Sequence, residues 1–158
     1  MGQHYGLKTP LLDWTYSPFA AAYFSFEDSV PTTEYRVVWG LDRNAVKRRS
    51  DELNNAESFE RGRPPVIEFI DPMLDENARL VSQGGLFSRA PVALSIEDWV
   101  SSQFEGSSAQ VLLRLEIPDK DRIGCLRTLN RMNINHLSLF PDLDGASRST
   151  NLRLELGI

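Results

Sequence analysis

The sequence has few of the residues that build disulfides and metal sites. Its 158 residues include one cysteine, Cys125, and two histidines, His4 and His136. A single cysteine excludes an internal disulfide and a metal cluster built on thiolates, and it fits the reducing environment of the cytosol. We therefore expect a cytoplasmic protein without a metal centre.

Long apolar runs are also missing. The sequence has no stretch of about 18 consecutive apolar residues, and its N-terminus shows no charged leader followed by an apolar run. We therefore expect neither a membrane-spanning helix nor a signal peptide, and no membrane partner.

Positive charge is in deficit, with 17 Lys and Arg residues against 22 Asp and Glu residues and a net charge of -5. Non-specific binding to nucleic acid needs a broad basic surface, which this balance does not favour. The basic cluster at residues 47–49 is expected to be a solvated face. With 41% hydrophobic residues the composition is that of an average globular protein, and the length fits a single domain over residues 1–158.

Short strands and helices alternate irregularly along the chain. Apolar and β-branched runs predict strands near residues 11–14, 35–41, 66–70, 86–88 and 111–117. Helical spacing and capping residues predict helices near residues 18–26, 76–82, 96–103, 119–132 and 147–156. Since the regular βαβ rhythm is missing, we predict an α+β fold with a mixed, mostly antiparallel sheet and short flanking helices.

Three of these elements have a pattern clear enough to predict their buried faces. Ser17 can cap the first helix with Pro18 in its first turn, and the helical spacing predicts burial of Phe19, Ala22, Tyr23 and Phe26. The strand at residues 111–117 alternates Leu113, Leu115 and Ile117 with charged residues. The helix that follows has apolar positions at Ile123, Leu126, Leu129 and Met132.

Residues 48–65 lose all periodicity. This stretch is charged and polar and ends in Pro64 and Pro65, and Asp42 before it is expected to cap only a short basic turn. The composition predicts a long surface loop that is mobile or orders with a partner.

Three blocks of the sequence resemble the FRG domain family. Residues 3–18 read QHYGLKTPLLDWTYSP and, with the small and aromatic residues 20–24, resemble the core block of that family. Residues 83–87, QGGLF, and residues 139–145, LFPDLDG, resemble its later blocks, so the resemblance covers nearly the whole chain. The Phe-Arg-Gly segment of the family precedes its first block, and we expect this chain to lack the corresponding N-terminal strand.

A more distant similarity implies a chemistry. The strand ending in Thr15-x-Ser17, followed by a helix rich in small residues, is similar to the Ser-Thr-Ser strand and helix of ADP-ribosyltransferases, where that strand supports the NAD site. The similarity implies a split sheet, and it places Gln83 where those enzymes carry a catalytic glutamate. A neutral amide cannot stabilise a ribosyl cation by charge, as a carboxylate does.

Eight residues are candidates for the site. His4 could shuttle a proton or donate to a ribose or phosphate, or else anchor a turn, and Gln83 could present its amide in a cleft or end a helix. We expect these two to be catalytic and to meet Thr15 and Ser17 in one cleft. The ligand-binding candidates are Tyr5, Asp13, Trp14, Thr15, Ser17 and Phe87.

Four of the ligand-binding candidates also have a structural interpretation. Asp13 is expected to bond backbone N–H groups of the next helix, and Trp14 to lie in the core rather than to stack on a ligand. Thr15 and Ser17 are cap residues at a helix start whose free N–H groups could bind a phosphate. His136 is expected to be a core histidine, and the Asp142 and Asp144 pair to cap a turn rather than to bind calcium.

Three functions remain open from the sequence. The first is an ADP-ribosyltransferase-like effector of a bacterial toxin or phage-defence system, with NAD or a nucleotide as substrate or ligand and no resident cofactor. The second is a non-catalytic module that binds a ligand or a protein partner. The third is a metal-dependent nuclease, which would add Glu27 or Asp28 to His4 and Asp13.

Overall fold

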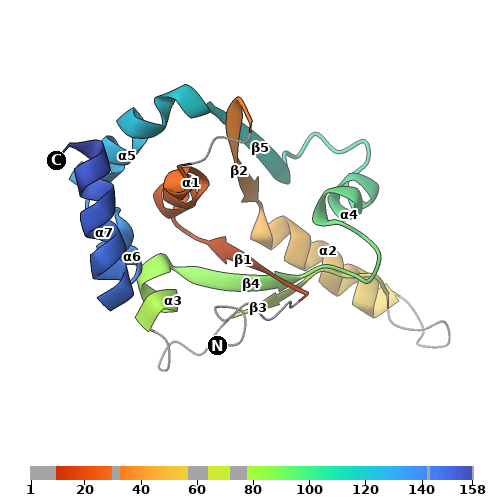
Figure 1. The fold of residues 1–158 in the computed structure, drawn as a ribbon. Coiled ribbons are helices and arrows are strands. Elements are labelled where there is room, and N and C mark those ends of the chain that lie inside the picture. The colour runs from red at the N-terminus through yellow and green to blue at the C-terminus, as the bar shows by residue number, and fades with distance from the viewer. Residues whose placement is uncertain (1–9, 30–32, 57–63, 72–77, 142, 158) are drawn as a thin grey trace. The chain divides into compact units, whose positions relative to one another are not determined.

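The computed structural model describes residues 10–29, 33–56, 64–71, 78–141 and 143–157 (Figure 1). In these residues the chain is about half helical with two small antiparallel sheets, which confirms the predicted α+β class. The strands are β1 Leu11–Thr15, β2 Tyr35–Leu41, β3 Glu68–Ile70, β4 Gly85–Arg89 and β5 Leu112–Pro118. The helices are α1 Pro18–Glu27, α2 Arg43–Ala56, α3 Ala78–Gln83, α4 Ile96–Gln103, α5 Arg122–Arg131, α6 His136–Leu139 and α7 Leu143–Leu156, with a 3-10 turn, η4, at Asp119–Asp121.

One sheet has the strand order β1-β4-β3 and the other consists of β2 and β5. β3 runs antiparallel to β4, with Glu68 opposite Arg89 and Phe69 opposite Ser88. All five predicted strands are present. The alternation in β5 does not separate a buried face from an exposed one, because Leu113 and Leu115 are exposed along with their charged neighbours. In the described residues β5 pairs with β2 alone, and a two-stranded sheet covers little of its own surface.

The chain groups into two compact units. Unit 1 comprises Met1–Asp13, Gly40–Asp71 and Phe87–Leu113, and unit 2 comprises Trp14–Trp39, Pro72–Leu86 and Arg114–Ile158. The chain passes from one unit to the other within four strands, after residue 13 in β1, residue 39 in β2, residue 86 in β4 and residue 113 in β5. The expectation of a single domain over residues 1–158 stays a prediction.

Unit 1 is built around Trp99, whose side chain is fully buried. The Trp99 indole donates a hydrogen bond to the Pro65 carbonyl at 2.6 Å, and the Ser50 hydroxyl donates to the Ile67 carbonyl at 3.1 Å. These two bonds hold the segment that leads into β3. The other buried apolar residues of the unit are Val46, Val66, Ile67, Ile96, Val100 and Val111.

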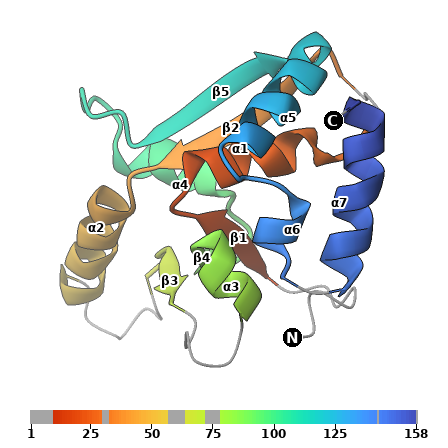
Figure 2. The same ribbon diagram turned by 90° about the vertical axis from the view of Figure 1, so that its left-hand side faces the viewer.

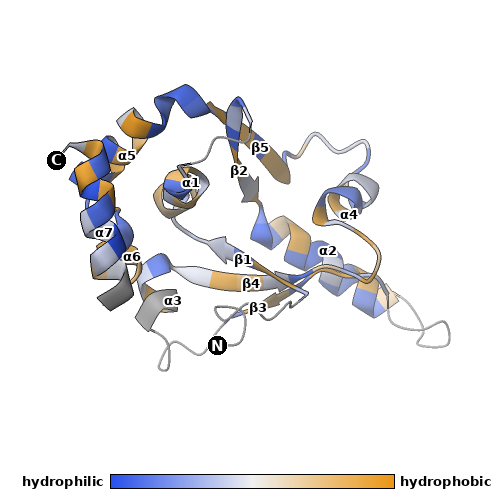
Figure 3. Cartoon of the chain, viewed as in Figure 1, coloured by the Kyte–Doolittle hydropathy of each residue, from blue (hydrophilic) through white to orange (hydrophobic). Residues whose placement is uncertain are grey.

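The surface loop predicted over residues 48–65 is wrong for its first half, since α2 continues to Ala56. Asp42 does cap this helix, accepting from the Ala45 N–H at 3.0 Å. Most of α2 is hydrophilic in Figure 3, and its buried face rests on Val46 and the small Ser50 one turn later. The half-buried Leu53 continues this face, but two apolar residues in a charged stretch are too weak a pattern to predict the helix, and packing on β3 supplies the rest. Residues 57–63 lie outside the described part.

Unit 2 is a cluster of helices, with α1 packed on α5, α6 on α7 and α5 on α7 (Figures 1 and 2). Its buried hydrophobic cluster consists of Ala20, Tyr23, Phe26, Leu126, Leu129, Leu139 and Leu156. None of the described helices is long and apolar enough to cross a membrane.

Two expected core positions of unit 2 are exposed. Phe19 is 49% exposed because the buried stripe of α1 follows Ala20, Tyr23 and Phe26 instead. Met132 is 45% exposed because α5 ends at Arg131, and Asn133 adopts a left-handed backbone (φ 61°) that stops the helix.

Candidate functional site

The corner between β1 and α1 is fixed by two hydroxyls. The Ser17 hydroxyl accepts from the Ala20 N–H at 3.2 Å and caps α1, with Pro18 in the first turn, as predicted. The Thr15 hydroxyl accepts from the Ser17 N–H at 3.0 Å. These hydroxyls occupy donors that a phosphate would need, and Pro18 has no N–H, so within the described first turn only the Phe19 N–H remains.

Three segments far apart in the sequence are hydrogen-bonded beside this corner. The Thr15 hydroxyl donates to the Gln83 carbonyl at 2.6 Å, and the Tyr16 N–H donates to the Gly84 carbonyl at 3.0 Å. The Gln83 side-chain amide donates to the Leu139 carbonyl at 3.1 Å. We call these five residues the junction. Its three segments lie within residues 3–18, 83–87 and 139–145.

Gly84 ends α3 at the junction with a left-handed backbone (φ 56°). A Cβ atom built there would lie 3.9 Å from the Thr15 hydroxyl and from Tyr16, which is ordinary contact. The position therefore requires glycine for its backbone conformation and not for lack of space.

The junction presents an amide oxygen and an aromatic ring. The Gln83 Nε2 is engaged with Leu139, whereas no donor in the described part of the chain reaches the Gln83 Oε1. Tyr16 is 61% exposed and offers an aromatic surface next to Gly84. A carboxamide neither gains nor loses a proton at neutral pH, so Gln83 provides no acid or base.

The other predicted site residues differ in how far the structure describes them. His4 and Tyr5 lie outside the described residues. Asp13 on β1 is exposed and Phe87 on β4 is half-buried, both in unit 1, whereas Trp14 lies in unit 2 and is also half-buried. The tryptophan that fills a core is Trp99.

The described residues hold no group of three His, Cys, Asp or Glu side chains that could bind a metal ion. Asp142 and the side chain of Asp144 lie outside the described part. Burial, with a smaller effect from the negative charge of Asp121, raises the pKa of the Cys125 thiol, which disfavours the nucleophilic thiolate.

A polar cluster lies inside unit 2 where α1 meets α6. His136 is 4% exposed, and its Nδ1 atom lies 3.1 Å from Glu27 Oε1 and 3.3 Å from the Tyr23 hydroxyl. Its ring stacks on Phe140 with centroids 4.3 Å apart. His136 is thus a buried core histidine, as predicted. Burial first, and then the charge of Glu27, raise the pKa of Tyr23 to about 12.

Two arginines bind the C-terminal end of α1. Arg122, which is buried, donates to the carbonyls of Phe26 and Glu27 and pairs with Glu155 at 2.5 Å. Arg36 donates to the Asp28 carbonyl at 3.1 Å and pairs with Asp119 at 2.5 Å. Cations stabilise the free carbonyls at a helix C-terminus. Neither residue is predictable from the sequence, since nothing in its local pattern distinguishes it from a surface arginine.

No curated protein and no solved structure matches the chain. The comparisons add no support for the similarity to ADP-ribosyltransferases. A family model matches the start of the chain and does not extend to the blocks at residues 83–87 and 139–145. Their residues Gln83, Gly84 and Leu139 nevertheless bond to each other or to the first block at the junction. The model of the FRG domain matches residues 1–34 of this chain, the stretch that contains β1, α1 and the Thr15 and Tyr16 side of the junction.

Proposed function

We propose that the chain is an FRG domain that binds a nucleotide-type ligand, such as NAD or ADP-ribose, at the junction. The single observation that carries the proposal is the convergence of Thr15, Tyr16, Gln83, Gly84 and Leu139 from three segments. Each helix forms through hydrogen bonds within its own segment and does not need the long-range bonds of the junction. A shared ligand site would explain why the three segments bond to one another.

The ligand class follows from two groups at the junction. An exposed aromatic ring such as that of Tyr16 can stack on a nucleobase, which is favourable by about 1–3 kcal/mol. The Gln83 Oε1 can accept a hydrogen bond from an amino group such as that of adenine. The start of α1 is a poor phosphate site, because the Thr15 and Ser17 hydroxyls already accept hydrogen bonds from most of its N–H groups.

NAD glycosyl transfer or hydrolysis, as in an effector of a toxin or phage-defence system, is the catalytic form of this proposal. The second candidate is a module that binds the ligand without turnover. Gln83 favours it, because its side-chain amide is neutral and its Nε2 already donates to the Leu139 carbonyl. The two forms differ in chemistry and not in where the ligand binds.

A thermal-shift screen with NAD, ADP-ribose and ATP tests the proposal. Binding should raise Tm in the wild type and less so in Tyr16→Ala, whereas Gln110→Ala, an exposed glutamine outside the junction, should behave as the wild type. Nicotinamide release from NAD would establish the catalytic form. No shift with any of the three ligands would contradict the proposal.

A further inference from the structure

The Nδ1 atom of His136 lies between two groups of opposite hydrogen-bonding preference. Glu27 Oε1, at 3.1 Å, is a carboxylate oxygen and only accepts when ionised. The Tyr23 hydroxyl, at 3.3 Å, can donate, and with its pKa raised to about 12 it keeps its proton at neutral pH. One ring nitrogen can serve as a donor or as an acceptor at a given moment, but not as both.

We propose that His136 is a proton-controlled switch between Glu27 and Tyr23. When the imidazole is protonated, its Nδ1–H donates to the Glu27 carboxylate and ties the last turn of α1 to α6. When the imidazole is neutral, Nδ1 accepts from the Tyr23 hydroxyl, and the Glu27 carboxylate turns to solvent.

The partial exposure of Glu27 makes the second state accessible. Its side chain is 34% exposed while that of His136 is 4% exposed, so Glu27 can be hydrated without moving the histidine. In the neutral state the Nδ1 lone pair repels the ionised Glu27 carboxylate at 3.1 Å, and this repulsion favours the turn of Glu27 to solvent. The Tyr23 bond then keeps the buried ring satisfied.

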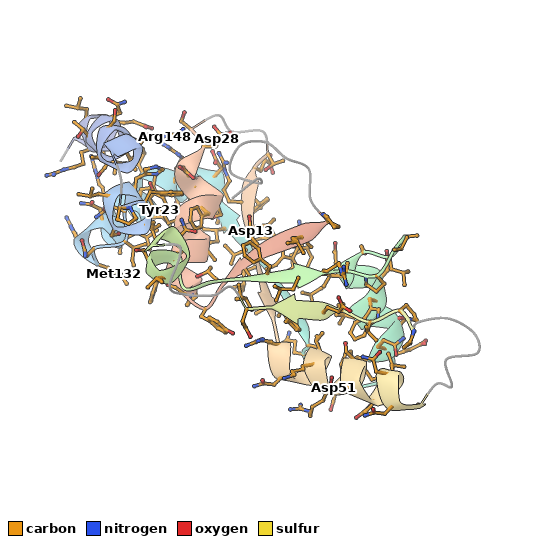
Figure 4. The ribbon with its side chains drawn as sticks, turned by 90° about the horizontal axis from the view of Figure 1, so that it is seen from below. Asp13, Tyr23, Asp28, Asp51, Met132 and Arg148 are labelled. Atoms are coloured by element: carbon orange, nitrogen blue, oxygen red, sulfur yellow. The ribbon has the colours of Figure 1, made fainter. Side chains whose placement is uncertain are left out.

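The charges around His136 set a balance between the two states. Glu27 on α1 favours the imidazolium. Arg122 on α5 and Arg148 on α7 oppose it, because both are close enough to Tyr23 to lower the pKa of its phenol, against the larger effects of burial and of Glu27 (Figure 4 labels Tyr23 and Arg148). Glu155 on α7 offsets Arg122, with which it pairs at 2.5 Å. The described side chains of α3, residues 81–83, carry no charge.

The switch reaches the junction through one residue. Leu139 lies in the same helical turn as His136, and its carbonyl accepts from the Gln83 side chain at 3.1 Å. The turn is held as a unit by Asn135 and Ser138, which bond each other's backbone N–H groups. A shift of α6 relative to α1 therefore changes the position of the carbonyl that Gln83 bonds.

Nitrogen-15 NMR of the whole chain tests the switch, with His136→Gln used to assign the ring signals. Below its titration midpoint both ring nitrogens of His136 should be protonated, and above it Nδ1 should be the nitrogen without a proton. Glu27→Gln should lower the midpoint by about one pH unit, because it removes the charge that favours the imidazolium. Tyr23→Phe should raise it, because it removes the donor of the neutral state.

Glu155→Gln is the matched control. It removes a carboxylate of the same cluster that does not contact His136, so its effect on the midpoint should be smaller than that of Glu27→Gln. Circular dichroism establishes that each variant is folded. A proton that stays on Nδ1 in the neutral ring, or midpoints that move in the same direction in Glu27→Gln and Tyr23→Phe, would refute the switch.

The coupling to the junction is read in the same spectra. The side-chain amide signals of Gln83 should shift with the His136 midpoint in the wild type and stay constant in His136→Gln. Signals of Gln83 that do not follow the midpoint would show that the switch stops at α6. Neither readout needs a ligand, so both stand apart from the outcome of the thermal-shift screen.

Discussion

The two units of the molecule hold their elements together in different ways. Unit 1 relies on a buried tryptophan, and three of its ion pairs lie on the surface, Arg43 with Asp71, Arg49 with Glu52 and Arg89 with Glu68. Such pairs each contribute about 0–1 kcal/mol. Unit 1 should therefore respond to changes in packing and little to changes in charge.

Unit 2 buries three basic side chains. Those of Arg122, Arg36 and His136 are 9%, 12% and 4% exposed, and each lies beside a carboxylate, whereas the pair of Arg114 with Glu116 is exposed. Removing a buried cation leaves carbonyls and carboxylates without a partner. We therefore expect the stability of unit 2 to depend on charge more than that of unit 1.

The largest expected effect is in unit 1. Trp99→Ala should lower the free energy of unfolding by about 3–5 kcal/mol, because a fully buried aromatic side chain is lost together with its bond to Pro65. Trp14→Ala should cost less, since Trp14 is half-buried. Urea denaturation measures both. A loss for Trp99→Ala below that for Trp14→Ala would contradict the assignment of the core.

Arg122→Met should cost about 2 kcal/mol, because the carbonyls of Phe26 and Glu27 lose a charged donor while the aliphatic part of the side chain is kept. The control is Arg131→Met on the exposed end of the same helix, which should change stability by about 0.5 kcal/mol or less. Urea denaturation at low and high salt compares them. Equal effects would remove the contrast between buried and surface cations.

Raising the pH should weaken unit 2 through Tyr23. Its pKa is raised from 10.0 to about 12 in the folded state, so the unfolded chain loses this proton first as the pH rises. The contribution of the neutral phenol is complete below pH 10 and is lost as the pH approaches 12. Stability curves over this range should fall less in Tyr23→Phe, and the exposed Tyr35→Phe should match the wild type. An identical fall in Tyr23→Phe would disprove the role of Tyr23.

The smallest expected effect is a pair of glycine substitutions with opposite signs. Gly84→Ala should destabilise by about 1 kcal/mol, because alanine disfavours its left-handed backbone even though space for a Cβ exists. Gly124→Ala in α5 should stabilise by about 0.5–1 kcal/mol, since its Cβ would meet open space in a regular helix. Thermal unfolding measures both. A stabilising Gly84→Ala would contradict the junction geometry.

Local signals were predicted well because their causes are local. Ser17, Pro18 and Asp42 start helices through bonds within one turn, and the strands at β1, β2 and β5 follow from apolar and β-branched runs. The length of α2 could not be predicted, since its buried face has only Val46 and the half-buried Leu53 as large apolar residues and depends on packing against β3. Of the residues expected to share a cleft, Thr15 and Gln83 are in contact, through the Gln83 backbone carbonyl rather than its side chain, and their role in a site stays a prediction.

The sequence by itself determined the α+β class, the caps of α1 and α2, the glycine stop at Gly84 and the resemblance of the first block to FRG domains, because each depends on residues close together in the chain. Only the tertiary structure decided that Arg122 is buried, that Trp99 and not Trp14 fills a core, and that His136 lies between Glu27 and Tyr23. An arginine has the same local pattern at a surface and in a core, and the apolar neighbours of His136 predict its burial but not its polar partners. These depend on contacts nearly a hundred residues away or more, such as Phe26 for Arg122 and Tyr23 for His136.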